Sequence, residues 1–170
     1  MKALLNFFVD LCLLRAAPQD LSASSVILAG TFLLNILVSL LMIVDARHGP
    51  GLALIESLFE TFLMLAALYL ALRTRRLRGR FQQSATALMG SGLLLGLLLG
   101  LLALPLVAWS HRSESTEAGL LLLVLIIWSI VVLGHIIRHT FGLTLNIGVA
   151  FGVLYTMLAW SMVARLFPVT

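Results

Sequence analysis

The sequence predicts an all-α, polytopic integral membrane protein, with five transmembrane helices preceded by a short amphipathic helix in the membrane interface. Of its 170 residues, 61% are apolar and 11% are charged, whereas soluble domains are roughly 45–50% apolar and about 25% charged. Five apolar segments are each long enough to cross a hydrocarbon core about 30 Å thick. The segments lack the alternating polarity of membrane β-barrel strands. The composition therefore excludes a soluble enzyme and a disordered chain.

The N-terminal segment, residues 1–17, is predicted to be the interfacial helix. Lys2, Asn6 and Asp10 recur every four residues and therefore share one stripe of a helix, with apolar side chains around the rest. Pro18 disfavours helical geometry in the residue before it, so the helix is expected to end there. Asp10 also interrupts the apolar run that a cleaved signal peptide needs, and we therefore expect no cleavage.

The rest of the chain, residues 18–170, is predicted to form one five-helix transmembrane domain. Polar and turn-forming residues separate the apolar segments, and the loops are too short for a folded soluble domain. Serine and aspartate side chains before the first segment provide oxygen atoms that can cap a helix. The spans are expected at about 22–44, 51–72, 85–109, 118–138 and 145–167.

The distribution of basic residues predicts the orientation in the membrane. The N-terminal segment and the connections after the second and fourth spans hold eight of the 11 Lys and Arg residues, and the opposite side holds three. Because cytoplasmic loops carry an excess of positive charge, we expect the N-terminus in the cytoplasm and the C-terminus outside. The minimal loops and the leucine- and arginine-rich composition favour a bacterial inner membrane. One cluster dominates the count: Arg73, Arg75, Arg76, Arg78 and Arg80.

A glycine pattern in the third span predicts a helix-packing face. Gly92, Gly96 and Gly100 form two overlapping G-x-x-x-G units, which place the three glycines along one groove. Because lipid provides no hydrophobic drive between helices, close backbone approach takes its place. We expect the groove to pack against another span of the same chain rather than against a second chain. The alternative is that these residues reflect only the abundance of glycine in membrane helices.

Asn35, Glu56 and Glu60 are the polar residues of interest inside the predicted spans. Ionisable groups at this depth are costly and usually face a partner or a wet cavity. Asn35 and Glu60 lie near the middle of the first and second spans, so a hydrogen bond between them would join the two helices. The alternative is a proton or cation site. Glu56 is expected to pair with Arg47, His48, His111 or Arg112.

Another group, His135, Arg138 and His139, shares one face at the end of the fourth span. Two histidines four residues apart can bind a metal, but Glu60 is expected roughly 10 Å or more away along the bilayer normal. We therefore expect no metal and no cofactor, and interpret the three residues as a basic patch. With the arginine cluster at 73–80, this patch is expected to bind anionic lipid headgroups or an acidic partner. The alternative is that the arginines are only a topology signal.

The predicted architecture resembles the Yip1-like group of small membrane proteins. A short cytoplasmic N-terminal segment precedes five closely spaced spans in fewer than 200 residues, and the resemblance covers residues 22–167 as an architecture. The chain departs from the eukaryotic members in lacking their short Asp-Leu-Tyr-Gly-Pro type of motif. The resemblance implies a non-enzymatic membrane protein that acts through partners or lipids, and it transfers no functional residue.

The leading interpretation is a non-enzymatic membrane scaffold or accessory subunit of a membrane complex. Its partners would be membrane lipids and either another protein or a second copy of the chain. Nucleic acid is excluded because the positive charge is not spread over a polar face. The alternative is a small proton- or cation-coupled transporter or channel that uses Glu60 and Asn35. A membrane-embedded enzyme ranks third, because the sequence lacks a Walker loop, a G-x-S-x-G elbow and a metal-ligand cluster.

Overall fold

Helices make up the whole of the regular structure in the part of the chain that the structure describes. The computed structural model describes residues 2–43, 49–113 and 116–167, with side chains outside 43, 103–118 and 122, and over these ranges it contains no strand. Five helices there are long and apolar enough to cross a membrane. The all-α prediction with five such helices is therefore confirmed at this level.

Eight helical elements follow one another in these described ranges. Two of them, labelled η, are single turns of 3-10 helix, and the other six are α-helices. The bounds are α1 Lys2–Cys12, η1 Pro18–Asp20, α2 Ser25–Ile43, α3 Pro50–Thr74, η2 Arg78–Arg80, α4 Phe81–Ser113, α5 Thr116–Phe141 and α6 Leu145–Leu166.

The helices differ from the predicted spans at their ends. α4 extends about four residues beyond the predicted 85–109 in both directions, because a helix needs only its backbone hydrogen bonds to continue past the apolar segment. Its polar first turn is held by the N-terminal segment, to which Gln83 Nε2 donates a hydrogen bond at the Leu21 carbonyl, 2.7 Å away. α1 is shorter than predicted, since it ends at Cys12.

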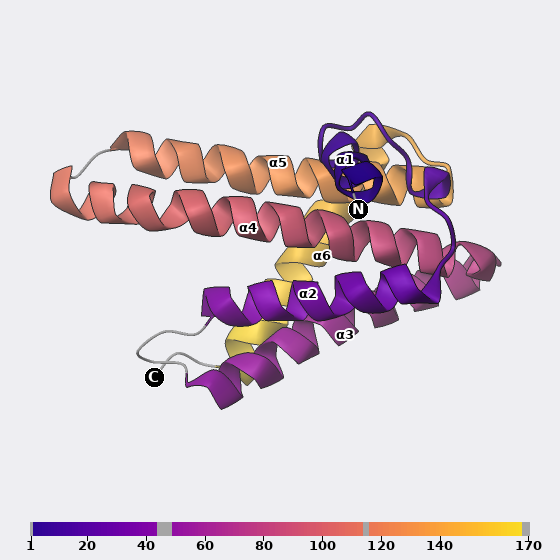
Figure 1. Cartoon of the computed structure of the whole chain (residues 1–170), viewed down its shortest axis with the longest axis horizontal. Helices are drawn as coiled ribbons and strands as arrows, with labels where there is room; N and C mark the ends of the chain where they lie inside the picture. Colours follow the sequence, from indigo (N-terminus) through magenta and orange to yellow (C-terminus); the bar gives the residue numbers. More distant parts are fainter. Residues whose placement is uncertain (1, 44–48, 114–115, 168–170) are drawn as a thin grey trace.

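Figure 1 shows how the six α-helices are arranged. α4 and α5 lie side by side as a long antiparallel hairpin, with α2 packed along α4 and α3 beside α2. α6 packs against α5 and crosses behind the other helices, whereas α1 lies across the α4–α5 hairpin. α4 is the central helix, because half of its apolar segment is buried, against 17–24% for the corresponding segments of the other four.

Three helices, α1, α3 and α5, end in the same way. In each, one residue adopts a left-handed conformation: Leu14 has φ 63°, Arg76 has φ 58° and Gly142 has φ 68°. The next residue then donates its N–H to a carbonyl five positions back, which satisfies an acceptor that the helix end leaves free. These closing hydrogen bonds run from Arg15 to Asp10 at 2.8 Å, from Leu77 to Leu72 at 2.9 Å and from Leu143 to Arg138 at 2.9 Å.

The turn between α5 and α6 provides a test of this geometry. We expect Gly142→Ala to destabilise the protein by about 1 kcal/mol, because a Cβ makes the left-handed conformation unfavourable. The loss comes from the backbone alone, since a Cβ at Gly142 would meet no atom within 4 Å. Thermal unfolding of the purified protein in detergent measures the change.

Gly30→Ala is the matched control for that substitution. Gly30 lies within α2 and also has open space around it. Alanine is the better helix former, so this variant should unfold at the same or a higher temperature. Equal midpoints for the two variants would contradict the strain assigned to Gly142.

Candidate functional site

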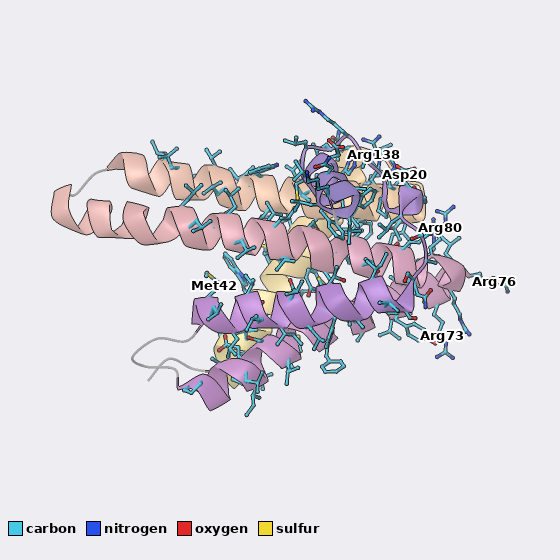
Figure 2. The ribbon with its side chains drawn as sticks, viewed as in Figure 1. Asp20, Met42, Arg73, Arg76, Arg80 and Arg138 are labelled. Atoms are coloured by element: carbon cyan, nitrogen blue, oxygen red, sulfur yellow. The ribbon has the colours of Figure 1, made fainter. Side chains whose placement is uncertain are left out.

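The end of the bundle where α3 and α5 stop and α4 begins carries most of the arginines, and we call it the arginine end. Figure 2 shows Arg73, Arg76 and Arg80 gathered there, with Arg138 at the same end of α5. Guanidinium groups present planar, bidentate donors that match phosphate oxygens. Four of the arginines here are exposed: Arg73, Arg75, Arg76 and Arg78.

Arg80 differs from its neighbours because it is a structural contact. It is half-buried, and its Nη1 donates a hydrogen bond to the Thr140 carbonyl 2.9 Å away on α5. Below it, the hydroxyls of Ser84 and Thr140 lie 3.0 Å apart, and both side chains are 1% exposed. These contacts join α4 to α5 at the arginine end. They fix the position of the segment that carries the exposed arginines.

Two side chains of α5 contact backbone carbonyls at the end of α1 and in the segment after it through their ring nitrogens. Trp128 Nε1 donates to the Cys12 carbonyl at 3.0 Å, and His135 Nε2 lies 2.9 Å from the Ala16 carbonyl. Trp128 and His135 are seven residues apart and therefore lie on the same face of α5. The Cys12 carbonyl belongs to the last turn of α1, so Trp128 supplies a hydrogen bond that the helix end lacks. The Ala16 carbonyl lies in the segment that follows the helix. We call this pair of contacts the N-terminal clasp.

The N-terminal clasp continues toward the arginine end through glutamine side chains. Gln19 Nε2 donates to the His139 carbonyl on α5, and Gln83 Nε2 of α4 donates to the Leu21 carbonyl. The N-terminal segment is thereby attached to both helices of the hairpin. This role of Trp128 could not be predicted from the sequence, because nothing in the sequence shows that a free carbonyl lies opposite it.

His135 and His139 occupy different environments although they share one face of α5. His135 is 3% exposed and lies beneath the N-terminal segment, whereas His139 is half-buried. The two rings meet edge to face with centroids 4.5 Å apart. Since a carbonyl only accepts, Nε2 of His135 carries the proton, and Nδ1 is buried without a hydrogen-bond partner among the described residues. We therefore leave His135 out of the exposed basic surface.

The predicted glycine groove on α4 faces α2. A Cβ added to Gly92 would lie 3.0 Å from Asn35 Oδ1, and one added to Gly96 would lie 3.1 Å from Val38 Cγ1. At Gly100 the nearest neighbour is the side chain of Met42, labelled beside α4 in Figure 2. Side chains of another helix of the same chain thus lie against the groove, which is buried at Gly100 and open at Gly92.

A second glycine contact joins α5 and α6 and is tighter than the first. A Cβ at Gly134 would lie 2.6 Å from Val149 Cα, and one at Gly148 would collide with the Gly134 carbonyl oxygen. These neighbours are backbone atoms, so the helices touch directly at this crossing. Sequence reasoning missed this contact, although the G-x-x-x-G spacing of Gly148 and Gly152 is a signal that could have predicted it.

The polar residues inside the predicted spans lie at separate interfaces. Asn35 points to Gly92 on α4, whereas Glu60 on α3 is near Tyr155 on α6. A hydrogen bond between Asn35 and Glu60 is not found among the described residues. The basic residues expected to pair with Glu56 lie where side chains are not described.

The described part of the chain contains no assembled metal-binding site. No three or more His, Cys, Asp or Glu side chains gather there in a way that could hold an ion. The glutamates of α3 and the histidines of α5 remain two separate groups, each with fewer protein ligands than structural zinc sites use.

Together these features define a class: an all-helical protein with five apolar helices that are compatible with integration into a membrane. Comparison with protein-family models, curated proteins and solved structures finds no match. Functional inference therefore depends on the residues of this chain.

Proposed function

We propose that the protein is a non-enzymatic membrane scaffold or accessory subunit that binds anionic lipid headgroups or an acidic partner at its arginine end. The observation that carries this proposal is the set of four exposed arginines at the junction of α3 and α4. Each basic residue close to an anionic membrane surface contributes about 1 kcal/mol of attraction. The five-span architecture, which resembles the Yip1-like group, implies the same kind of role.

The proposed orientation puts the arginine end in the cytoplasm of a bacterial inner membrane. This follows from the excess of arginine at that end, which is the side that short basic loops occupy. Anionic headgroups on the same side would meet the exposed guanidinium groups without desolvating them deeply. The arginines then serve both as the orientation signal and as the binding surface.

Replacing three exposed arginines tests the proposal. We expect the triple variant Arg75→Gln, Arg76→Gln, Arg78→Gln to bind cardiolipin roughly a hundredfold more weakly, because three contacts of about 1 kcal/mol are lost. Cardiolipin that co-purifies with the protein, quantified by mass spectrometry, is the measurement. Arg80 is kept because its contact with Thr140 is structural.

The control for the triple variant is Arg165→Gln, which removes a charge near the end of α6. Arg165 is exposed but lies at the opposite end of the bundle. Its loss should leave bound cardiolipin unchanged. Equal cardiolipin in the triple variant and the natural protein would reject the lipid-binding proposal, and loss of a stoichiometric protein partner from the triple variant would then favour the acidic partner.

A small proton- or cation-coupled transporter is the second candidate. Glu60 favours it, because this carboxyl is half-buried within α3 and near the phenol of Tyr155. Glu60→Gln separates the two candidates in reconstituted vesicles. If the protein is a scaffold, the natural protein shows no ion flux and the variant keeps its bound cardiolipin. If the protein is a transporter, the natural protein shows ion flux and the variant loses it.

A further inference from the structure

An apolar cavity of about 330 Å³ lies between α3, α5 and α6. Cavities of this size hold small-molecule ligands in other proteins. Met64 and Ala67 line it from α3, Leu133 from α5 and Phe151 from α6. None of these four residues has a polar side chain, so the cavity suits a hydrocarbon and offers little to a water-soluble ligand. The fit to an apolar ligand does not by itself identify the occupant.

The two ends of the cavity carry polar side chains, and only the one at the arginine end is charged. Arg75, the residue after the last turn of α3, lines the cavity at the arginine end. Tyr155 of α6 lines the other end, where Glu60 is nearby. A ligand with a hydrocarbon body and one anionic group matches this arrangement when its anion lies at Arg75.

The length of the cavity matches one leaflet of a bilayer. Met64 and Arg75 are 11 residues apart on α3, which corresponds to about 16 Å at the helical rise of 1.5 Å per residue. Half of a hydrocarbon core about 30 Å thick is about 15 Å. The cavity therefore runs from headgroup level to near the bilayer midplane, with Arg75 at headgroup level.

The membrane setting indicates which hydrophobic occupant the cavity takes. A single extended hydrocarbon chain is much narrower than a helix about 10 Å across, and a cavity of about 330 Å³ is of a size that holds small ligands. Because the lining helices are membrane-compatible spans, the surrounding lipid supplies such chains.

We propose that the cavity holds one acyl chain of a phospholipid whose phosphate contacts the Arg75 guanidinium. The preference for an anionic headgroup rests on the proposed function. The site for the acyl chain rests on the cavity alone. Arg75 is thereby distinguished from the other exposed arginines, since it is the one that also lines the hydrocarbon site.

Photo-crosslinking of the full-length protein tests the inference. The probe is phosphatidylglycerol with a diazirine in one acyl chain, diluted into phosphatidylcholine vesicles that contain the protein. We expect mass spectrometry to find cross-links concentrated on Met64, Leu133 and Phe151. Ala67→Phe should reduce these cross-links several-fold, because the added ring occupies the cavity.

Ala66→Phe is the matched control, since Ala66 is the exposed neighbour of Ala67 and does not line the cavity. It should leave the cross-links unchanged. Arg75→Gln supplies an independent test that adds no volume, and its charge-matched control is Arg15→Gln, an exposed residue outside the cavity. If gel filtration shows that Ala67→Phe is misfolded, the comparison of Arg75→Gln with Arg15→Gln decides.

The outcomes separate this inference from the proposed function. Cross-links spread evenly over the exposed faces, or cavity cross-links that neither Ala67→Phe nor Arg75→Gln lowers, would overturn the acyl-chain site. The proposed function would still be supported in that case if the amount of bound cardiolipin depends on the arginines. Cavity cross-links of equal yield with a phosphatidylcholine probe would support the acyl-chain site and reject the preference for anionic lipid.

Discussion

A leucine at Gly148 is expected to separate α6 from α5 and to produce the largest loss of stability of any single substitution considered. A side chain there collides with the Gly134 carbonyl oxygen and also lies 3.1 Å from Arg138 Cβ. Backbone atoms cannot rotate away as a flexible side chain does, so the whole helix must move. We expect a cost of about 3 kcal/mol or more, at the upper end of overpacking effects.

The dependence of α6 on this crossing makes the effect large. Gly148 and Gly152 are the residues of α6 that are buried. Because no other residue of α6 is buried, this crossing is the most deeply buried contact that holds α6 beside α5. Gly148→Leu should therefore lower the midpoint of thermal unfolding in detergent and leave insertion of the chain into the membrane unaffected.

Gly119→Leu is the control for the α5–α6 crossing. Gly119 lies near the start of α5, and a Cβ there meets nothing within 4 Å. Its unfolding midpoint should stay close to that of the natural protein. Identical midpoints for Gly148→Leu and Gly119→Leu would show that the backbone contact between α5 and α6 does not hold the helices together.

The α4 groove should tolerate a small substitution better than the α5–α6 crossing. At Gly100 the obstacle is the end of the Met42 side chain, which is unbranched and can adopt another rotamer. At Gly134 the obstacle is the backbone of Val149. Alanine at Gly100 is therefore less damaging than alanine at Gly134, and the unfolding midpoints of the two variants measure the difference.

The second large effect concerns the N-terminal clasp. It is measured as the rate at which Cys12, the single cysteine of the chain, reacts with a thiol reagent. Burial raises the pKa of the Cys12 thiol to about 11. Because only the thiolate reacts, maleimide labelling of the native protein should be slow at pH 8 and rise about tenfold per pH unit up to pH 11. The protein unfolded in detergent should label with an ordinary cysteine profile, with a midpoint near pH 9.

Removing the clasp should expose this thiol. The double variant Trp128→Phe, His135→Phe leaves the Cys12 and Ala16 carbonyls without their ring donors, at about 1–3 kcal/mol for each lost hydrogen bond. The equilibrium for opening of the N-terminal segment then shifts by a factor of roughly 100, and labelling at pH 8 accelerates accordingly. The midpoint of the pH profile also moves from about 11 toward 9.

Trp160→Phe is the control for the clasp, since Trp160 is exposed on α6. Its labelling rate should equal that of the natural protein. Rapid labelling of Cys12 in the natural protein at pH 8 would contradict the buried position of its side chain. Equal rates in the natural protein and the double variant would show that the two rings do not hold the segment.

The positions of the helices could be predicted from the sequence. The rotation of each helix about its own axis, which decides which face meets a neighbour, could not. Apolar length and turn residues predicted five spans, because both properties are local. The direction in which Asn35 points depends on which face of α2 meets α4, and this is decided by packing along the glycine groove. The expected pairing of Asn35 with Glu60 followed from depth alone, and depth carries no information about rotation.

The same limit explains the histidines. His135 and His139 are both basic residues at the end of a span, and by sequence they are equivalent members of a patch. They differ because the N-terminal segment folds over one of them, bringing the Ala16 carbonyl to the His135 ring across 119 positions of sequence. A contact at that separation has no local signature in the sequence.

The odd number of long helices has an electrostatic consequence for the arginine end. α2, α4 and α6 begin at that end, whereas α3 and α5 stop there. A helix carries a partial charge of roughly +0.5 at its N-terminus and roughly −0.5 at its C-terminus. Two antiparallel pairs cancel, and the fifth helix leaves one positive half-charge beside the guanidinium groups. The backbone therefore adds to the positive potential at this end.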